Sequence, residues 1–567
     1  MDSLSIFLLI GTSMLFIGLL LGTLSPRIGV PSLVMFLLVG MLAGEDGIGG
    51  IQFDDLSTAY VVSNIALAVI LLDGGLRTRA TSFRLVMKPA LTLASLGVMV
   101  SAALVGAFST WLMDIDWRLG LLLGGIIGST DAAAVFSVIK GAGVTINERV
   151  AATLEIESGL NDPMAIFITL MLVSVLIDPE TGFGWAMLLT LVQQFGLGIV
   201  MGLGLGATLS EILLRVRSNE GLHALLLCSG GAMVFALTNL AGGSGFLAIY
   251  LTGVVAGNRR AGTGDNVLRS MDSIAWLAQS GMFLMMGLLI NPSELAGGRL
   301  FNALLVAAFL MLVARPVSVW LSLIPFRYTW REKTFIAWTG LRGAVPIVLA
   351  VFPLLAGVGQ TRLLFDITLV VVLISLLIQG TSLRYMARLL KVSVPATTSP
   401  RQMVPLASAQ ERYVIQFAVD AGAKAEGQRL SAITSPRITP LLIIRDKEFR
   451  NLAEDPVIEA GDLVTWLAPM GERDYLSDLC HKMSREEKRF FGEFFVRGSV
   501  PVEQLVAVYG TEPLPPALHG LTLEAVFERQ LDQQAVVGDT LRLGGMTLRA
   551  RTVEQGRVVL AGIKLPK

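Results

Sequence analysis

The feature that most constrains this chain is a series of apolar runs, each about as long as a membrane helix, that occupies residues 4–389. A transmembrane helix needs roughly 20 apolar residues, because the hydrocarbon core of a bilayer is about 30 Å thick. This template predicts thirteen spans, at approximately 4–24, 30–43, 57–76, 88–112, 118–140, 151–176, 185–214, 222–240, 244–258, 271–290, 300–323, 333–356 and 363–389. We therefore expect an all-α polytopic membrane domain surrounded by membrane lipid.

Charged residues divide the chain into two parts. Hydrophobic residues make up 53% of the 567 positions, and about half of the 44 basic and 44 acidic residues follow Lys391. This asymmetry predicts a membrane domain over residues 1–391, a linker over 392–402, and small α/β cytoplasmic domains over 403–484 and 485–567. The first apolar run lacks the basic region and cleavage site of a signal peptide, so we expect it to remain as a span.

Composition also argues against several classes of partner. Basic and acidic residues balance without a basic run, which argues against nucleic acid as a partner. Two cysteines, Cys228 and Cys480, and three histidines are too few for a disulfide framework or a histidine-rich metal cluster. We expect no cofactor and no resident metal ion.

Positive charge predicts the orientation, because Lys and Arg are retained in cytoplasmic loops. The acidic or neutral loops alternate with loops that carry Arg27; Arg77, Arg79, Arg84 and Lys88; Lys140 and Arg149; Arg215 and Arg217; Arg259, Arg260 and Arg269; Arg327, Arg331 and Lys333; Arg384, Arg388 and Lys391. An odd number of spans puts the termini on opposite sides. We predict a multi-pass protein of the bacterial inner membrane, with a periplasmic N-terminus and a cytoplasmic tail.

Thirteen spans can be divided into six, one linker helix and six, which gives two inverted halves typical of transporters. Spans 5 and 12 are seven helices apart, and each contains helix breakers with an ionisable group at mid-depth. Their sequences are 124–131, GGIIGSTD, and 339–346, TGLRGAVP. Unwound backbone is tolerated there only if it lines a cavity or is buried in protein. We expect spans 5 and 12 to be broken helices that cross; a glycine-rich helix interface is the alternative.

Five ionisable residues stand out within the predicted spans: Asp73, Asp131, Glu157, Asp162 and Arg342. Each costs about 2.5–3.5 kcal/mol to insert, so each needs a partner or a function.

In span 6, i,i+4 spacing puts Ser158 with Asp162 on one face and Glu157 with Asn161 beside it. Together with Thr130, Asp131 and freed carbonyls near the break in span 5, these oxygens suit a small hard cation. Arg342 is the expected partner of Glu157, which leaves Asp162 unpaired. Such a carboxylate can hold either a proton or a cation, and alternation between the two is exchange.

Structural alternatives exist for these charges. Asp73 could form an interfacial ion pair with Arg77, Glu155 could be a solvated or structural charge at a helix entry, and the whole set could be a salt-bridge network. The last alternative is disfavoured, because buried ion pairs stabilise a bundle poorly.

These motifs resemble the monovalent cation:proton antiporters of the NhaP branch, over essentially residues 1–391. They are Thr130-Asp131, the sequence ESGLNDP at 157–163, and Leu341-Arg342-Gly343. The resemblance implies a homodimer, each protomer having a dimer-forming bundle and a core bundle that moves like an elevator. It also implies site roles: Asp162 exchanges; Ser158, the Thr130 region and Asp73 assist the cation; Asp131 lies near the crossing breaks; and Glu157 pairs with Arg342. The pair Asn161-Asp162 is similar to electroneutral members.

The tail has two further resemblances. Strand-like runs at 413–417, 441–445 and 462–467 look like the RCK-C (TrkA-C) ligand-sensing module, without the NAD-binding half that usually accompanies it. Residues 485–567 are similar to the transporter-associated domain of CorC/HlyC-type proteins. The combination points to a K⁺/H⁺ antiporter, which could also carry Na⁺ or other alkali cations. A small ligand, a nucleotide or a cytoplasmic regulatory protein could bind the tail.

Two other classes fit less well. The sequence GTGD at 262–265 matches intramembrane aspartyl proteases, but it follows Arg259 and Arg260 in a predicted cytoplasmic loop, where a solvated turn is the simpler interpretation. A ligand-gated potassium channel or efflux system is the second alternative. A channel requires a ring of carbonyls rather than a buried carboxylate, and the chain has no Thr-Val-Gly-Tyr-Gly filter sequence. We therefore expect a secondary transporter and not an enzyme.

Overall fold

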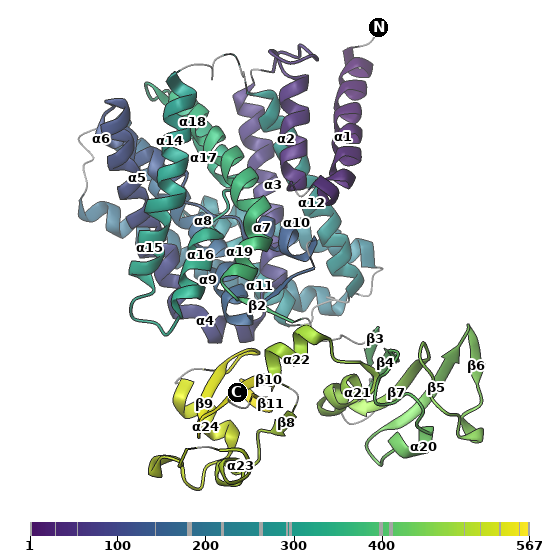
Figure 1. Ribbon diagram of the computed structural model, residues 1–567. Coiled ribbons are helices and arrows are strands. Elements are labelled where there is room, and N and C mark those ends of the chain that lie inside the picture. The colour runs from purple at the N-terminus through teal and green to yellow at the C-terminus, as the bar shows by residue number, and fades with distance from the viewer. Residues whose placement is uncertain are drawn as a thin grey trace. The chain divides into compact units, whose positions relative to one another are not determined.

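The structure is a computed structural model that describes residues 3–564, except for 29, 54, 142, 179–183, 217–219, 260–264, 291–292, 294–297, 396–400, 407–411, 493, 511, 532–533 and 555. The chain divides into two compact units, Met1–Ser393 and Val394–Lys567 (Figure 1). Residues 262–264 of the protease-like motif and the linker residues 396–400 lie outside the described residues.

The first unit is helical, as predicted. Its first half contains α1 (Ser3–Ile28), α2 (Ser32–Ala43), α3 (Leu56–Arg77), α4 (Ala80–Thr92), η1 (Leu93–Gly97), α5 (Val98–Met113), α6 (Trp117–Ile126), α7 (Ala132–Gly141), β1 (Thr145–Ile146) and α8 (Glu148–Ile177). Asp55 caps the start of α3 by accepting from the Thr58 backbone N–H at 3.0 Å, which satisfies one of the free donors of a helix N-terminus.

The second half continues with α9 (Trp185–Arg215), α10 (Glu220–Leu240), α11 (Gly245–Asn258), α12 (Asp265–Leu288), α14 (Gly298–Phe309), η3 (Leu310–Ala314), α15 (Arg315–Ser322), α16 (Trp330–Trp338), α17 (Val345–Leu355), α18 (Thr361–Ile374), η4 (Ser375–Gln379), α19 (Gly380–Leu389) and β2 (Ser393–Val394). Among the described residues, eight helices are long and apolar enough to cross a membrane, counting runs such as 85–113 that continue through a π-helical turn. The predicted all-α polytopic domain is confirmed.

Two features repeat at matching positions of the halves. The π-helical turn η1 interrupts the run α4–α5, and η3 interrupts α14–α15, seven predicted spans later. Predicted spans 5 and 12 are each divided into two short helices, α6 with α7 and α16 with α17. These paired irregularities agree with an inverted repeat.

The second unit contains two small α/β modules. The first has the antiparallel sheet β3-β4-β7-β5-β6, made of β3 (Gln402–Pro405), β4 (Arg412–Ala418), β5 (Thr439–Arg445), β6 (Glu448–Arg450) and β7 (Leu463–Pro469). Its short helices are α20 (Leu430–Ile433), η5 (Leu452–Glu454), η6 (Met470–Glu472) and α21 (Arg473–Cys480). Its core surrounds Trp466, which is fully buried.

The second module has the antiparallel sheet β8-β11-β10-β9, made of β8 (Phe494–Arg497), β9 (Thr540–Leu543), β10 (Met546–Glu554) and β11 (Arg557–Lys564). The helices are α22 (Arg485–Phe491), α23 (Val502–Tyr509), η7 (Pro516–Leu518) and α24 (Leu523–Leu531). Phe527, Met546 and Leu548 are fully buried in its core. The strand-like runs predicted at 413–417, 441–445 and 462–467 coincide with β4, β5 and β7.

Candidate functional site

Two helix breaks meet inside the first unit. Helix α6 ends at Ile126 and α7 begins at Ala132, while α16 ends at Trp338 and α17 begins at Val345. The Asp131 backbone N–H donates to the Leu341 carbonyl oxygen at 2.8 Å. A Cβ at Gly343 would collide with the Asp131 side chain, so the absence of a side chain there lets the segments approach. The predicted crossing of two broken helices is confirmed.

Arg342 satisfies the end of α6. Its side chain is buried, and its Nη1 donates to the carbonyl oxygens of Gly128 and Ser129 at 2.7 and 2.6 Å. Gly128 and Ser129 follow the end of α6 at Ile126, so their carbonyls have no intrahelical partner and lie at the helix end that carries partial negative charge. A guanidinium at this position therefore both hydrogen-bonds these carbonyls and compensates their charge.

The predicted ion pair between Glu157 and Arg342 is wrong. Glu157 instead pairs with Arg315 Nη1 through its Oε1, at 2.6 Å, and both side chains are almost fully buried, with 1% and 3% exposed. The physical reason is that the Arg342 guanidinium donates to the free carbonyls of the helix break, so Glu157 pairs with a different arginine. Arg315, at the start of α15, lies against Gly340 and reaches α8.

The predicted oxygen cluster forms around the break between α6 and α7. Ser158 Oγ donates to the Thr130 carbonyl oxygen at 2.8 Å and accepts from the Ala132 backbone N–H at 3.1 Å. Asn161 Nδ2 donates to Thr130 Oγ1 at 2.5 Å. One turn of the polar face of α8 thus holds the broken segment and the start of α7.

Asp162 lies in this cluster and is only 5% exposed. Within the described part of the chain, the Asp162 carboxylate accepts a hydrogen bond from the Ser129 hydroxyl. Ser129 was not predicted as a site residue, although it stands next to Thr130 in the broken segment. A carboxylate with four lone-pair sites and one hydroxyl partner retains capacity to accept a proton or bind a cation.

Asp131 has a second role that its sequence position did not indicate. Its Oδ1 accepts from the Ala134 backbone N–H at 3.0 Å, as an N-cap residue does at the start of α7. Its Oδ2 is 3.4 Å from Gln279 Nε2 of α12. Asp131 therefore lies at the crossing, as predicted, and its contacts stabilise the start of α7.

Asp73 lies in a separate cluster. Its carboxylate pairs with Arg77 Nε at 2.9 Å in the i,i+4 arrangement, and Arg77 also pairs with Asp272 of α12. These contacts match the interfacial ion pair that the sequence left open. Asp73 is thus held at the end of α3 by Arg77, while Asp162 accepts from Ser129 in the broken segment.

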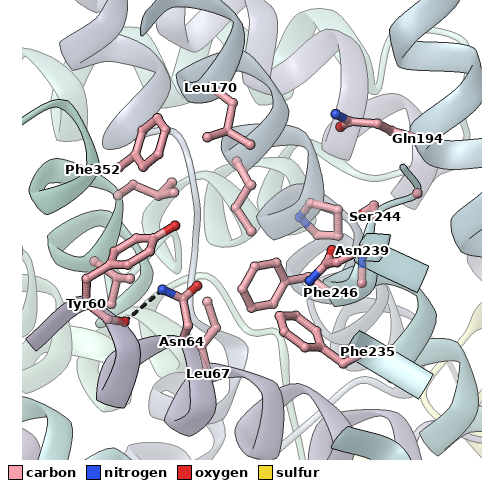
Figure 2. A pocket seen from close by; sticks show the side chains of 16 residues that line it. Tyr60, Asn64, Leu67, Leu170, Gln194, Phe235, Asn239, Ser244, Phe246 and Phe352 are labelled. Carbon is pink, nitrogen blue, oxygen red and sulfur yellow. Dashed lines mark hydrogen bonds between the residues drawn. The ribbon is translucent and has the colours of Figure 1, made fainter. Parts of the chain in front are cut away.

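A cavity of about 250 Å³ opens beside the cluster (Figure 2). Pro163, which follows Asp162, is one of its lining residues. The other lining residues are Tyr60, Asn64, Leu67, Ile166, Leu170, Gln194, Phe235, Asn239, Gly243, Ser244, Gly245, Phe246, Val348, Leu349 and Phe352. The amide side chains of Asn64, Gln194 and Asn239 make part of this wall polar.

Sequence reasoning missed two buried charges. Arg315 lies inside the apolar span predicted at 300–323, directly before Pro316, and an arginine at that depth was a detectable signal. Asp366 lies inside span 363–389, is 6% exposed, and is 3.6 Å from Arg299 and 3.7 Å from Arg362.

Within the described residues, no group of three or more His, Cys, Asp or Glu side chains could hold a metal ion. The donors around Asp162 are one carboxylate with hydroxyl and carbonyl oxygens. Such oxygens are hard ligands, and they suit a transported alkali cation better than a resident transition metal.

Crossed broken helices around a buried carboxylate define an ion-exchanger type of membrane protein, and the comparisons agree. Residues 12–389 match the family described as sodium/hydrogen exchanger, transmembrane, and the chain belongs to this family. Membership of an exchanger family does not favour the channel alternative.

The similar proteins include two bacterial relatives and one solved structure. The chain is 43% identical to a K(+)/H(+) antiporter NhaP2 of Shewanella sp. (strain ANA-3), and 38% identical to a K(+)/H(+) antiporter NhaP of Alkalimonas amylolytica. Both comparisons cover 100% of this chain and 99% of the relative. The sodium proton antiporter MjNhaP1 from Methanocaldococcus jannaschii, solved at pH 8, is 25% identical with a TM-score of 0.59. That match covers 67% of this chain and 100% of the other.

Proposed function

We propose that this protein exchanges intracellular K⁺ for H⁺ across the bacterial inner membrane, with Na⁺ or other alkali cations as further substrates. Two relatives named as K(+)/H(+) antiporters align with the whole chain, tail included. The observation that carries the proposal is the environment of Asp162, a buried carboxylate with one hydroxyl partner at the crossing of two helix breaks.

Asp162 is the proposed shared site. The Asp162 carboxylate, the Ser129 and Ser158 hydroxyls and the Thr130 carbonyl supply oxygens to a dehydrated cation. When the cation leaves, the same carboxylate takes a proton, because burial disfavours its charged form. Asn161 holds Thr130 in place, and Asp131 fixes the start of α7.

The charge balance favours electroneutral exchange. Arg315 compensates Glu157, and Arg342 and Asp131 add one positive and one negative charge at the helix crossing, so Asp162 remains for the transported charge. Asn161, next to Asp162, is neutral. One proton therefore replaces one monovalent cation.

The other proposed features follow the resemblance and the loop charges. The N-terminus lies in the periplasm and the tail in the cytoplasm, since Lys and Arg occur in alternate loops. Two protomers form a homodimer, and an elevator-like movement of the core bundle gives alternating access.

We propose that the tail regulates exchange through an RCK-C-like module over 403–484 and a transporter-associated domain over 485–567. The presence of two modules with separate cores supports this proposal. Deleting residues 401–567 should change the dependence of exchange on cytoplasmic conditions while leaving exchange itself intact. Identical exchange with and without these residues, across all conditions tested, would refute regulation.

The test of the main proposal is the pH change that K⁺, Na⁺ or Li⁺ induces in everted membrane vesicles. Wild-type protein should dissipate an imposed pH gradient when K⁺ is added, and Asp162→Asn should abolish the response to each cation that wild type carries. Asp272→Asn, in which the altered carboxylate is largely exposed, is the control and should retain exchange. Exchange preserved in Asp162→Asn would remove Asp162 from the mechanism.

A further inference from the structure

The cavity lies on one side of Asp162 along three helices. On α8 its lining residues, Pro163, Ile166 and Leu170, follow Asp162 in sequence. On α3 and α11 the lining residues, among them Asn64 and Phe246, lie in the first half of each helix. The cavity therefore opens toward the side on which α8 ends and α3 and α11 begin.

Asn64 presents a polar group to this cavity. Its Nδ2 donates to the Tyr60 carbonyl oxygen at 2.8 Å, and its carbonyl oxygen lies on the side away from Tyr60 (Figure 2). The neighbouring lining side chains include the rings of Phe246 and Phe352. An oxygen acceptor in an otherwise largely apolar wall is suited to a cation that has lost part of its water.

Tyr250 of α11 packs against α8 on the opposite side of Asp162, toward the start of that helix. Its side chain is 2% exposed, and its ring occupies the space that a Cβ at Gly159 would need. Gly159 precedes Asp162 by three residues and so lies on a neighbouring part of the same helix face. The missing side chain lets the aromatic ring rest directly against α8, next to the cation cluster.

A hydrogen bond holds the ring in this position. Thr78, the residue after α3, gives its hydroxyl proton to the Gly74 carbonyl oxygen at 2.9 Å. Its oxygen can therefore accept from the Tyr250 hydroxyl, 3.4 Å away. The contact thus joins Tyr250 of α11 to the end of α3.

Helices α3 and α11 form one packed pair, to which Tyr250 belongs. A Cβ at Gly75, Gly253 or Gly257 would collide with backbone atoms of the facing helix, so the two backbones are in close contact. The interaction of Tyr250 with α8 is of a different kind, because a ring rests on a glycine without backbone interlocking. It is therefore the contact that can separate while the α3–α11 pair stays intact.

We propose that Tyr250 is the gate residue of this exchanger: the structure is the state in which Asp162 is reached through the cavity that Asn64 lines, and Tyr250 against Gly159 seals the other side. This inference rests on the proposed role of Asp162. In the opposite state, α8 moves away from Tyr250, and the cation reaches Asp162 from the side on which α8 begins.

The test measures access directly, through the reactivity of a cysteine at position 64. The native Cys228 and Cys480 are replaced by serine, Asn64→Cys is introduced, and a membrane-impermeant maleimide is applied to right-side-out or everted vesicles. Labelling should occur from one face only. Tyr250→Ala, which removes the ring that rests against Gly159, should slow it by about two- to tenfold, because losing a contact made in only one of two states shifts the population toward the other state.

Tyr328→Phe is the matched control. Its hydroxyl also bonds a residue of α8, Thr153 at 2.7 Å, but it lies outside the α3–α11 pair. Labelling should therefore be unchanged in Tyr328→Phe. Tyr250→Phe keeps the ring and loses only the hydrogen bond to Thr78, inside the α3–α11 pair, so it should label at close to the wild-type rate. Folding of Tyr250→Ala is checked by size-exclusion chromatography.

Two outcomes would overturn the inference: a cysteine at position 64 that reacts from neither face or equally from both, or a labelling rate that Tyr250→Ala leaves unchanged. Because labelling needs no transport, the experiment also works in the Asp162→Asn background. If Asp162→Asn retains exchange while position 64 still reacts from one face at a rate that depends on Tyr250, the proposed role of Asp162 is refuted and the gate is not.

Discussion

In the first unit, Glu157 and Arg315 meet at 2.6 Å with 1% and 3% of their side chains exposed. In the tail, the fully buried Asp462 meets Arg445 at 2.8 Å, but Arg445 remains 19% exposed. The hydrogen bond to Asp462 raises the pKa of Arg445 above its usual value. The tail can leave one end of its ion pair in water, whereas the membrane unit has to compensate both charges internally, which makes the loss of either partner more costly.

The two buried aspartates, Asp162 and Asp462, differ in the same way. Asp462 accepts from Arg445 Nε and Nη2 and from the Glu459 backbone N–H, each at 2.8 Å. Asp162 accepts from the Ser129 hydroxyl. A carboxylate whose lone pairs all accept hydrogen bonds stabilises the fold. A carboxylate with free lone pairs can bind a proton or a cation reversibly.

The largest effect is expected from breaking the membrane ion pair. Glu157→Gln leaves Arg315 buried without its counter-charge and should cost about 3–5 kcal/mol of stability. The measurement is thermal unfolding of the purified protein in detergent. The double variant Glu157→Leu with Arg315→Met should recover most of the loss, because an apolar pair of similar volume replaces the ion pair. No recovery would mean that each charge has a separate role.

Arg342→Met should have the next largest effect. It leaves the Gly128 and Ser129 carbonyls without their donor, at about 1–3 kcal/mol for each buried unsatisfied group. Exchange in everted vesicles should fall with stability, because the same two residues border the Asp162 cluster. Arg331→Met, an exposed arginine in α16, is the control. A stable but inactive Arg342→Met protein would assign Arg342 to transport alone.

In the tail, Arg445→Met should cost about 1.5–3 kcal/mol, the range for hydrogen bonds to a charged group. The loss should appear as faster proteolysis within residues 412–469 of the full-length protein. Exchange by the membrane unit should persist. Arg437→Met, whose side chain is 79% exposed, is the control and should resist proteolysis as wild type does. Loss of exchange in Arg445→Met would contradict the separation of the two units.

The smallest effect concerns Asp455, at the tail surface. Hydrogen bonds from the Ser431 hydroxyl and backbone N–H hold the pKa of Asp455 below its usual value. A depressed folded-state pKa stabilises the fold above the unfolded-state pKa, and the stabilisation is lost as the pH falls through the folded value. Asp455→Asn should therefore lower tail stability slightly at pH 7 and by less at pH 3. Proteolysis near α20 at the two pH values measures this, and an equal difference at both would contradict it.

The sequence predicted much of the site because helix periodicity is local. Ser158, Asn161 and Asp162 were expected on neighbouring positions of one helix, and all of them contact the break between α6 and α7. The partner of Glu157 was missed because Arg342 and Arg315 are distant from it in sequence. To predict which arginine pairs with Glu157, one must know which of the two binds the free carbonyls of the broken helix.

The sequence by itself determined the polytopic membrane domain, the position of the two helix breaks and the small α/β tail. These depend on span length, glycine content and strand alternation, which act over a few residues. Only the tertiary structure decided that Arg315 pairs with Glu157, that Arg342 binds Gly128 and Ser129, and that Tyr250 rests on Gly159. Those choices depend on which distant groups compete for the same buried charge or space, and that competition exists only once the helices have packed.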